Sequence, residues 1–251
     1  MAASNPRTIA VLFSSVGSGM GDVGKFCVVQ GLRKTGVVIK PVALSAPLTE
    51  GSDKQITVDV TYEAGKAQVS DAFGSLPSLP RIDITSQEAQ SKIEDELQGC
   101  DAVIACLGSR QPSKKTRWCA LGAEKIVAAM KSAGVERIVN LSSMGIGEDF
   151  QPWNFLKYFW WLFLRTVIPS ALSDLTAMEK VITTSGLDYL QVMCMGISPE
   201  EPPRGSWHLL EKRGDGKLAM TVSKEDVAAF MLSEAITPKH SKARVTIGYK
   251  V

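Results

Sequence analysis

A glycine-rich segment near the amino terminus has the spacing of a phosphate-binding turn. Residues 17–24 read Gly-Ser-Gly-Met-Gly-Asp-Val-Gly, so that Gly19, Gly21 and Gly24 form a G-x-G-x-x-G pattern between an apolar run and a helical pattern. Backbone N–H groups at such a turn, together with the positive end of the following helix, can hold a pyrophosphate. The alternative is a flexible turn between two packed elements, because the pattern also occurs by chance.

The end of the second strand-like run, residues 37–44, bears on the choice of dinucleotide. A carboxylate at this point would bind the ribose of NAD, and a nearby Arg would bind the 2′-phosphate of NADP. The run instead ends at Ser45, which can donate a hydrogen bond, while Lys40 or Lys54 could supply positive charge. Because no carboxylate repels a phosphate, we expect NADP(H) rather than NAD(H). The same absence also fits a chain that binds no dinucleotide.

The composition is that of an ordinary globular protein. The 251 residues are 45% apolar and 22% charged, with 28 Lys and Arg against 26 Asp and Glu and a net charge of +2. This balance does not predict a nucleic-acid-binding surface. Five cysteines without C-x-x-C spacing and only two histidines argue against a disulfide framework and a metal site. With no secretory signal evident, we expect a cytoplasmic protein.

Strand-like runs and helical patterns alternate along the chain. Strands are expected at 8–14, 37–44, 101–107, 137–141, 189–193 and 243–249. Helices are expected at 25–35, 86–97, 120–133, 173–185 and 222–235. The alternation predicts βαβ units in a single α/β domain, 1–251, with a doubly wound, mainly parallel sheet. Residues 46–80 interrupt the pattern and are expected to form an inserted loop or hairpin, with a strand candidate at 56–60.

Four strand ends are the expected ligand-binding positions. In a doubly wound sheet the ligand lies beyond the carboxyl ends of the strands, near the point where the strand order reverses. The loops at these ends begin at Ser14, Gly108, Ser142 and Met193.

Six ordered segments carry a family resemblance. They are 101–110 (DAVIACLGSR), 122–131 (GAEKIVAAMK), 134–139 (GVERIV), 178–181 (MEKV), 185–189 (SGLDY) and 222–226 (VSKED). In this order they resemble the NAD(P)H-binding atypical short-chain dehydrogenases, and within these the biliverdin-IXβ reductase and flavin reductase group. The resemblance extends over about half of the chain and implies a Rossmann-like fold.

The resemblance also implies a site at the strand ends. With the glycine segment, the implied cofactor-binding residues are Gly17, Gly19, Met20, Gly21, Asp22, Val23, Ser45, Leu107, Gly108, Ser109, Arg110, Ser142, Met193 and Cys194. The expected substrate pocket consists of Met144, Met195 and Gly196 together with Tyr158, Trp160 and Trp161 of the aromatic segment described below. Ser143 is the candidate catalytic residue, placed beside the nicotinamide. The alternative is that Ser142 and Ser143 only cap a strand end and that 193–195 are core.

The chain departs from the family at three places. The first loop of the family is commonly the shorter Gly-Ala-Thr-Gly-x-x-Gly, and the arginine after its second strand has no counterpart here. The Tyr-x-x-x-Lys pair of many short-chain dehydrogenases is replaced by Ala171 and Leu175. A reaction that needs a built-in acid is therefore disfavoured. The resemblance implies a conjugated acceptor instead, for which solvent supplies the proton.

The segment at 148–172 is unusually aromatic. Its centre, 153–169, reads WNFLKYFWWLFLRTVIP, which is shorter than the roughly 20 residues that a spanning helix needs. Its place after Ser143 suggests a substrate lid, because aromatic faces stack on flat ligands and exclude water. Core packing, an interface between copies of the chain and a membrane-surface contact are the alternatives.

These features together predict an NAD(P)H-dependent reductase that transfers hydride to a planar or hydrophobic conjugated substrate. One alternative is a non-redox isomerase or cyclase on the same scaffold. Another is a non-catalytic dinucleotide-binding regulator or assembly factor.

Overall fold

Strands and helices alternate along the chain. The computed structural model describes residues 5–14, 19–45, 80–108, 117–144, 146, 155–198, 200–211 and 218–251. The elements are β1 (Arg7–Ser14), α1 (Gly19–Leu32), β2 (Val37–Ser45), β3 (Arg81–Asp83), α3 (Ala89–Leu97), β4 (Ala102–Cys106), α4 (Trp118–Ala133), β5 (Arg137–Ser143), α5 (Phe155–Val167), α6 (Pro169–Thr183), β6 (Asp188–Cys194), β7 (Ile197–Ser198), β8 (His208–Leu210), β9 (Val222–Ser223), α7 (Lys224–Ile236) and β10 (Ala243–Gly248). The inserted segment expected at 46–80 lies outside these residues except for Pro80.

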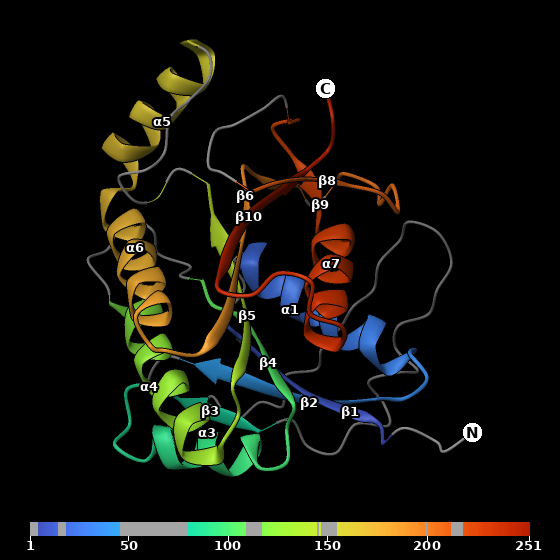
Figure 1. Cartoon of the computed structure of the whole chain (residues 1–251). Coiled ribbons are helices and arrows are strands. Elements are labelled where there is room, and N and C mark those ends of the chain that lie inside the picture. The colour runs from blue at the N-terminus through green and yellow to red at the C-terminus, as the bar shows by residue number, and fades with distance from the viewer. Residues whose placement is uncertain are drawn as a thin grey trace.

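One sheet of eight strands forms the centre of the described chain (Figure 1). Its order is β3-β2-β1-β4-β5-β6-β10-β8, and all neighbouring strands are parallel except β10 and β8. The chain starts at β1, builds outward through β2 and β3, and then returns to β4 on the other side of β1. This is the doubly wound, mainly parallel Rossmann-like architecture that the sequence predicts.

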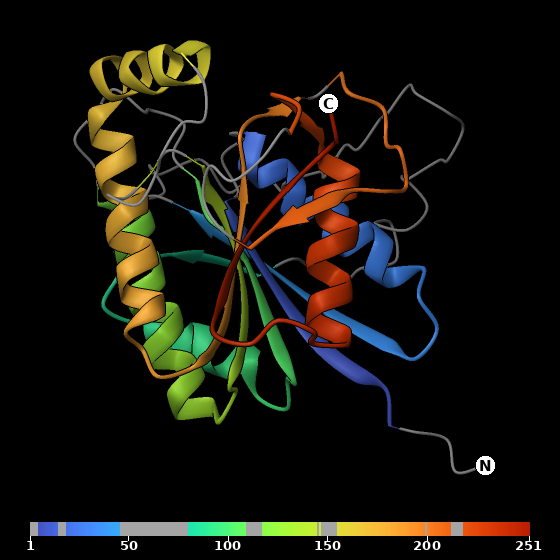
Figure 2. The ribbon, with the colours of Figure 1, turned by 45° about the horizontal axis from the view of Figure 1, so that its top comes forward.

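Helices cover both faces of this sheet (Figure 2). α1 and α7 pack together on one face, and α3, α4 and α6 pack on the other. Side chains of β1 alternate between the two resulting cores: Ile9, Val11 and Phe13 face the first, and Ala10 and Leu12 face the second. A strand that is buried on both faces is apolar throughout, which explains the continuous apolar run at the start of the chain.

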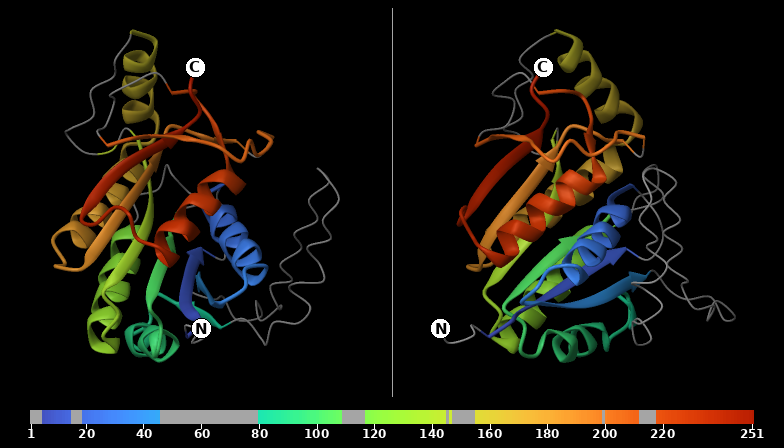
Figure 3. Two further views of the ribbon diagram at one scale, coloured as in Figure 1. Left: turned by 45° about the vertical axis from the view of Figure 1, so that its right-hand side comes forward. Right: turned by 90° about the vertical axis from the view of Figure 1, so that its right-hand side faces the viewer.

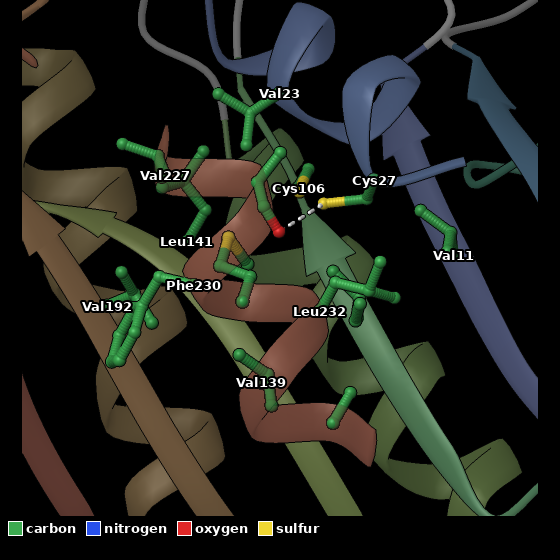
Figure 4. Close-up of a cluster of buried hydrophobic side chains, with 14 of the residues drawn as sticks. Val11, Val23, Cys27, Cys106, Val139, Leu141, Val192, Val227, Phe230 and Leu232 are labelled. Atoms are coloured by element: carbon green, nitrogen blue, oxygen red, sulfur yellow. Dashed lines mark hydrogen bonds between the residues drawn. The ribbon is translucent and has the colours of Figure 1, made fainter. Parts of the chain in front are cut away.

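The core beneath α7 joins this helix to α1 and to the central strands (Figure 4). Val139 of β5 and Val192 of β6 belong to the same buried cluster as Phe230 of α7. The Cys27 thiol of α1 donates a hydrogen bond to the Ala228 carbonyl oxygen of α7 at 3.8 Å. The cluster therefore fixes the position of α1, whose first turn carries the glycine pattern.

Three boundaries differ from those expected. α1 begins at Gly19 and not at residue 25, so the glycine pattern lies in the helix rather than in the loop before it. Residues 81–83 form β3, paired with β2, where only an approach to a helix was expected. α6 begins at Pro169, four residues early, because a proline lacks the N–H that the first helical turn leaves unpaired anyway.

α5 and α6 lead away from the end of β5. α6 descends toward the start of β6, so its first residue lies at the level of the carboxyl ends of the strands. α5 precedes it directly and projects beyond the rest of the described chain at that end (Figure 3).

Candidate functional site

The four strand ends expected to bind a ligand do meet at one edge of the sheet. β1 lies beside β4, β4 beside β5, and β5 beside β6, and all of them run in the same direction. In the register of the last pair, Ser142 lies opposite Met193 and Ser143 opposite Cys194. The edge formed by these ends is the carboxyl edge, at which open α/β sheets bind their ligands.

The strand order reverses between β1 and β4, and one side chain joins the two strands there. The hydroxyl of Ser14, the last residue of β1, donates to the Gly108 carbonyl oxygen at 3.0 Å and accepts from the Gly108 N–H at 2.9 Å. Both residues are buried. Gly108 directly follows Leu107, which is fully buried in the core on the α4 side. The floor of the candidate site is thus fixed by a pair of hydrogen bonds between strands 94 residues apart.

The glycine pattern places the start of α1 very close to β1. A Cβ atom at Gly24 would lie 2.5 Å from Phe13 Cβ and 3.3 Å from Cys106 Cβ, so only glycine allows this approach. Gly24 thus permits close packing of the helix on the strand, as the third glycine of a dinucleotide fingerprint does. Gly19 and Gly21 lie in the first turn of α1, where backbone N–H groups have no partner within the helix.

The remaining residues of the glycine pattern are described to different extents. Met20 and Asp22 also belong to the first turn of α1, with side chains outside the described part of the chain. Val23 is fully buried in the core between α1 and α7, so it positions the turn by packing. Gly17 and the later candidates Ser109 and Arg110 lie outside the described residues.

The end of β2 presents a buried hydroxyl with no partner among the described residues. Ser45 is 1% exposed, and its Oγ atom makes no hydrogen bond within that part of the chain. An unpaired buried hydroxyl is unfavourable unless a ligand or another group forms a hydrogen bond with it. Ser45 lies opposite Asp83 of β3, a carboxylate that the sequence analysis did not include. Asp83 was not predicted as a site residue because β3, which is only three residues long, was itself not predicted.

Two side chains near β2 and β3 are already occupied. The Asp83 Oδ1 atom accepts hydrogen bonds from the Thr85 N–H at 2.8 Å and the Thr85 hydroxyl at 2.7 Å. Lys40 Nζ donates to the carbonyl oxygens of Gln98 at 2.8 Å and Glu96 at 3.4 Å. The suggestion that Lys40 supplies charge to a phosphate is therefore wrong, because its ammonium group satisfies carbonyls at the end of α3. Lys54 lies outside the described residues.

The two serines at the end of β5 have different environments. Ser142 is fully buried and donates to Glu179 Oε1 of α6 at 2.6 Å. Ser143 is half-buried, and its hydroxyl donates only to the neighbouring Met144 carbonyl oxygen at 3.2 Å. Ser142 therefore connects β5 to α6, whereas the hydroxyl of Ser143 is held only by its own segment. Glu179 is 3% exposed, a burial that the general tendency of helix carboxylates to face solvent does not predict.

The candidate residues 193–196, at the end of β6, extend from the core to the candidate site. Met193 and Cys194 are buried, and burial raises the pKa of the Cys194 thiol to about 12. Met195 is half-buried. A Cβ atom at Gly196 would lie 2.9 Å from the Met220 carbonyl oxygen, so this glycine allows the strand pair β7 and β9 to close beside the site.

Ala171 and Leu175, which the sequence analysis aligned with the Tyr-x-x-x-Lys pair, lie in the first half of α6. Leu175 is 9% exposed and packs in the core, so it leaves no room for a polar group there. Its neighbour Asp174 accepts hydrogen bonds from the N–H groups of Cys119 and Ala120, both at 2.9 Å. The Asp174 carboxylate thereby caps the amino end of α4, where the positive end of the helix dipole stabilises its negative charge.

The substrate-side candidates are only partly described. Met144 is 6% exposed and lies directly after Ser143. Tyr158 lies on α5 with 48% of its surface exposed. Trp160 and Trp161 are also in α5, but their side chains fall outside the described part of the chain. In the structure α5 contacts chiefly α6, so it is an exposed helix beside the site and not a core element.

The strand order and the position of the start of α1 are those of an α/β protein of Rossmann type. The family model described as NAD(P)H-binding matches residues 57–238, and the chain therefore belongs to the NAD(P)H-binding family. This range begins after the glycine pattern, so the family match does not include the segment that departs most from the usual loop.

Solved structures with the same fold differ widely from this chain in sequence. A short-chain dehydrogenase/reductase from Veillonella parvula DSM 2008, in complex with NADP, has 14% identity and a TM-score of 0.65 over 96% of this chain and 94% of its own. A Rossmann-fold NAD(P)-binding family protein from Shigella flexneri has 18% identity and a TM-score of 0.61, with 97% and 93% covered. A candidate NADH-flavin reductase from Streptococcus pneumoniae TIGR4 has 15% identity and a TM-score of 0.58, with 97% and 100% covered.

The described residues offer neither a metal site nor a membrane-spanning helix. No group of three or more His, Cys, Asp or Glu residues in the described ranges could hold a metal ion. Among the helices of those ranges, none is long and apolar enough to cross a membrane.

Proposed function

We propose that the chain is an NAD(P)H-dependent reductase that acts on a planar or hydrophobic conjugated substrate. The observation that carries the proposal is the close approach at Gly24, which places the first turn of α1 against the end of β1, beside the point where the strand order reverses. In this family a bound reduced nicotinamide supplies the hydride. The residues of the chain must then bind the dinucleotide, orient its ring and exclude water.

The diphosphate-binding part of the proposal rests on backbone groups. N–H groups in the first turn of α1, from Gly19 to Asp22, have no helical partner and carry the positive end of the helix dipole. Gly108 lies on the neighbouring strand end, fixed by Ser14. These groups form a cradle that needs no side-chain charge.

The preference for NADP(H) over NAD(H) rests on Ser45. Its buried, unpartnered hydroxyl can donate to a 2′-phosphate at the end of β2, where a carboxylate would instead select NAD. Asp83 on the next strand carries a negative charge near this position, but its Oδ1 atom accepts two hydrogen bonds from Thr85. A hydrogen bond from the adenine amino group to this carboxylate is the matching role for Asp83.

The chemical step requires little of the protein in this proposal. Ser143 has a half-buried hydroxyl at the end of β5, bound only within its own segment, so it can turn toward a ligand carbonyl or amide. Leu175 stands where a catalytic lysine would be, so no lysine lowers the pKa of a neighbouring acid at that position. A conjugated acceptor fits this site, because hydride adds to the electron-poor system while solvent supplies the proton.

Fluorescence titration of the purified protein with NADPH and with NADH tests the binding half of the proposal, since the chain has five tryptophans. We expect saturable binding of both, with NADPH tighter. Assays with flavin, quinone and tetrapyrrole acceptors then test turnover by loss of NADPH absorbance. Lack of response to either dinucleotide would refute the reductase function. Saturable binding without oxidation on any acceptor would favour an isomerase or a dinucleotide-sensing regulator.

Gly21→Val tests the cradle itself. A branched side chain in the first turn of α1 would approach the bound phosphates, and we expect dinucleotide affinity to fall by at least about tenfold. Ser91→Val, at an exposed position of α3, is the control for a β-branched residue in a helix. Equal affinity of Gly21→Val and the unmodified protein would place the diphosphate elsewhere.

A further inference from the structure

The outer side of α5 is an exposed apolar face. It consists of Phe155, Tyr158, Phe159, Leu162, Phe163 and Val167, whose exposed fractions range from 44% to 83%. Their spacing of three and four residues places them along one side of the helix. The other exposed large apolar side chains of the described chain are Leu32, Val38, Met220 and the terminal Val251, which lie in separate parts of the sequence. The α5 face is therefore a concentrated patch, of the kind that soluble surfaces seldom leave uncovered.

The α5 face points away from the body of the protein. Among the described elements α5 contacts chiefly α6, and it extends past the carboxyl edge of the sheet (Figures 1 and 3). The face is thus convex, a ridge and not a groove. A ridge is poorly suited to receiving a peptide or a helix, which bind in grooves.

The charge within α5 has one sign. The helix contains Lys157 and Arg165 and no Asp or Glu, while the acidic residues Glu148, Asp149 and Asp174 lie outside it in the sequence. Arg165 is exposed, and its position in the helix puts it on the same side as Tyr158. A helix with Phe, Tyr and Leu on one side and an arginine at the border of that side resembles helices that lie in the interface of an anionic bilayer.

A second copy of the chain is a weaker occupant because of area. A helix of 13 residues is about 20 Å long and about 10 Å wide, so half of its lateral surface is roughly 300 Å². A stable interface between proteins buries about 800 Å² on each partner. Because α5 projects from the body, two copies that meet through this face would bring little other surface together. Binding to a bilayer has no such minimum area. It requires only that apolar side chains enter the acyl boundary and that basic side chains meet anionic headgroups.

We propose that the α5 face is a membrane-surface anchor. The helix lies in the plane of the interface, with Phe155, Phe159 and Leu162 in the acyl boundary and Arg165 among anionic headgroups. At about 20 Å it is too short to cross the hydrocarbon core of about 30 Å. The carboxyl edge of the sheet then faces the bilayer. Binding of α5 to a membrane surface does not depend on the reductase function proposed above. If the chain is also a reductase, its substrate comes from the lipid phase, and this second statement alone rests on the proposed function.

Co-sedimentation with lipid vesicles tests the anchor. Two vesicle types are compared, phosphatidylcholine alone and phosphatidylcholine mixed with phosphatidylglycerol. The full chain should sediment with the mixed vesicles, and added salt should weaken the binding. Absence of binding to the mixed vesicles would overturn the proposal.

Paired variants distinguish vesicle binding through the α5 face from non-specific hydrophobic binding. Phe159→Ser combined with Phe163→Ser should weaken vesicle binding by at least about tenfold, because burial of each ring contributes strongly. Val38→Ser combined with Met220→Ser removes side chains of 43% and 38% exposure elsewhere and should leave binding unchanged. Arg165→Gln should weaken binding to the anionic vesicles by about fivefold and leave binding to phosphatidylcholine alone unchanged.

Sedimentation velocity distinguishes a bilayer from a second copy. We expect the unmodified chain and Phe159→Ser/Phe163→Ser to sediment at the same molecular mass. A dimer that the double substitution converts to a monomer would overturn the proposal in favour of an interface between copies. Dinucleotide titration of the double variant is expected to match that of the unmodified chain, so loss of docking and failure of the reductase function remain separate results.

Discussion

Ser14 and Gly108 join the two halves of the sheet at the point where its strand order reverses. The Ser14 hydroxyl accepts from the Gly108 N–H at 2.9 Å and donates to the Gly108 carbonyl oxygen at 3.0 Å, with both residues buried. The Ser14 hydroxyl thus satisfies the hydrogen bonding of both the N–H and the carbonyl of Gly108, which follows β4. The loops that would enclose a dinucleotide start immediately beyond these two residues.

Ser14→Ala should destabilise the protein and weaken dinucleotide binding together. The substitution leaves a buried N–H and a buried carbonyl without a partner, and each such group costs about 1–3 kcal/mol. Urea unfolding followed by tryptophan fluorescence measures the first effect and NADPH titration the second. Ser91→Ala is the control, because that hydroxyl donates to the Glu88 carbonyl oxygen at an exposed position. Full stability of Ser14→Ala would mean that water replaces the hydroxyl.

Gly24→Ala should displace the start of α1. The added methyl group would lie 2.5 Å from Phe13 Cβ, an atom close to the backbone that cannot move without moving β1. Overpacking of this kind costs about 1–3 kcal/mol, and we expect dinucleotide affinity to fall as well. The measurements are urea unfolding and NADPH titration.

Gly31→Ala in the same helix is the matched control. Its methyl group would also lie 2.5 Å from two neighbouring atoms, but these are Cγ1 and Cδ1 of Ile39, which a change of side-chain rotamer can move without moving the backbone. We expect a smaller loss of stability and no change in NADPH affinity. A larger effect at Gly31 than at Gly24 would show that rigidity of α1, and not its approach to β1, governs binding.

The sequence predicted the sheet well because its strands are buried on both faces. β1 and β4 contain continuous apolar runs, and α4 ends before Gly134, whose φ of 71° is a conformation that glycine adopts freely. The start of α1 was misplaced because glycine is a poor helix former. Here tertiary packing overrides that tendency, since the approach of α1 to Phe13 excludes any side chain at Gly24.

Polar residues of the site were harder to predict than the fold. Asp83 belongs to a strand of three residues, too short for an alternating pattern to be recognised. Asp174 and Glu179 resemble ordinary surface charges of a helix, and only the structure shows that one caps α4 and the other accepts from Ser142. Burial of a carboxylate depends on a partner distant in sequence, which local pattern does not reveal.

Arg137→Met should destabilise the fold strongly at the amino edge of the sheet, opposite the candidate site. The Arg137 guanidinium is buried and lies 3.0 Å from an Asp188 carboxylate oxygen and 3.4 Å from one of Glu234. It also donates to the His240 carbonyl oxygen at 2.9 Å. Removal of one partner from a buried ion pair leaves an uncompensated charge and costs about 3–5 kcal/mol. Thermal and urea unfolding measure the loss.

Arg117→Met provides the comparison for Arg137→Met. Arg117 lies 3.0 Å from Glu124, but both side chains are largely exposed, at 77% and 44%. Exposed ion pairs contribute about 0–1 kcal/mol, so this variant should unfold almost like the unmodified chain. Similar losses for both variants would contradict the assignment of Arg137 to a buried network.

Cys100 should react first among the five cysteines of the native protein. Burial raises the pKa of Cys119 and of Cys194, the latter to about 12, and the pKa of Cys106 is raised by a hydrogen bond to Cys27 and by burial. Since the thiolate is the reactive form, a raised pKa slows reaction at neutral pH, and the rate rises as pH approaches the pKa. The pKa of Cys100 is also raised by partial burial, but its sulfur is the one that is incompletely buried.

Kinetics with an aromatic disulfide reagent measure this order. One thiol should react before the others, and Cys100→Ser should remove that phase, while denaturant should expose the remaining four. Rapid modification of Cys194 in the folded protein would show that the end of β6 opens to solvent.

Ser143→Ala should affect mainly catalysis and Ser142→Ala mainly stability, because the two hydroxyls have different partners. Ser143 donates only to the adjacent Met144 carbonyl oxygen, so its loss should leave the free energy of unfolding within about 0.5 kcal/mol of the original value. If it positions the acceptor beside the nicotinamide, kcat should fall by about tenfold or more with NADPH affinity unchanged. Ser142 donates to the buried Glu179 at 2.6 Å, so its loss should cost about 1–3 kcal/mol of stability. Steady-state kinetics with the best acceptor, together with urea unfolding of both variants, separate the two roles; normal kcat in Ser143→Ala would remove this residue from the catalytic step and leave only the positioning of the dinucleotide.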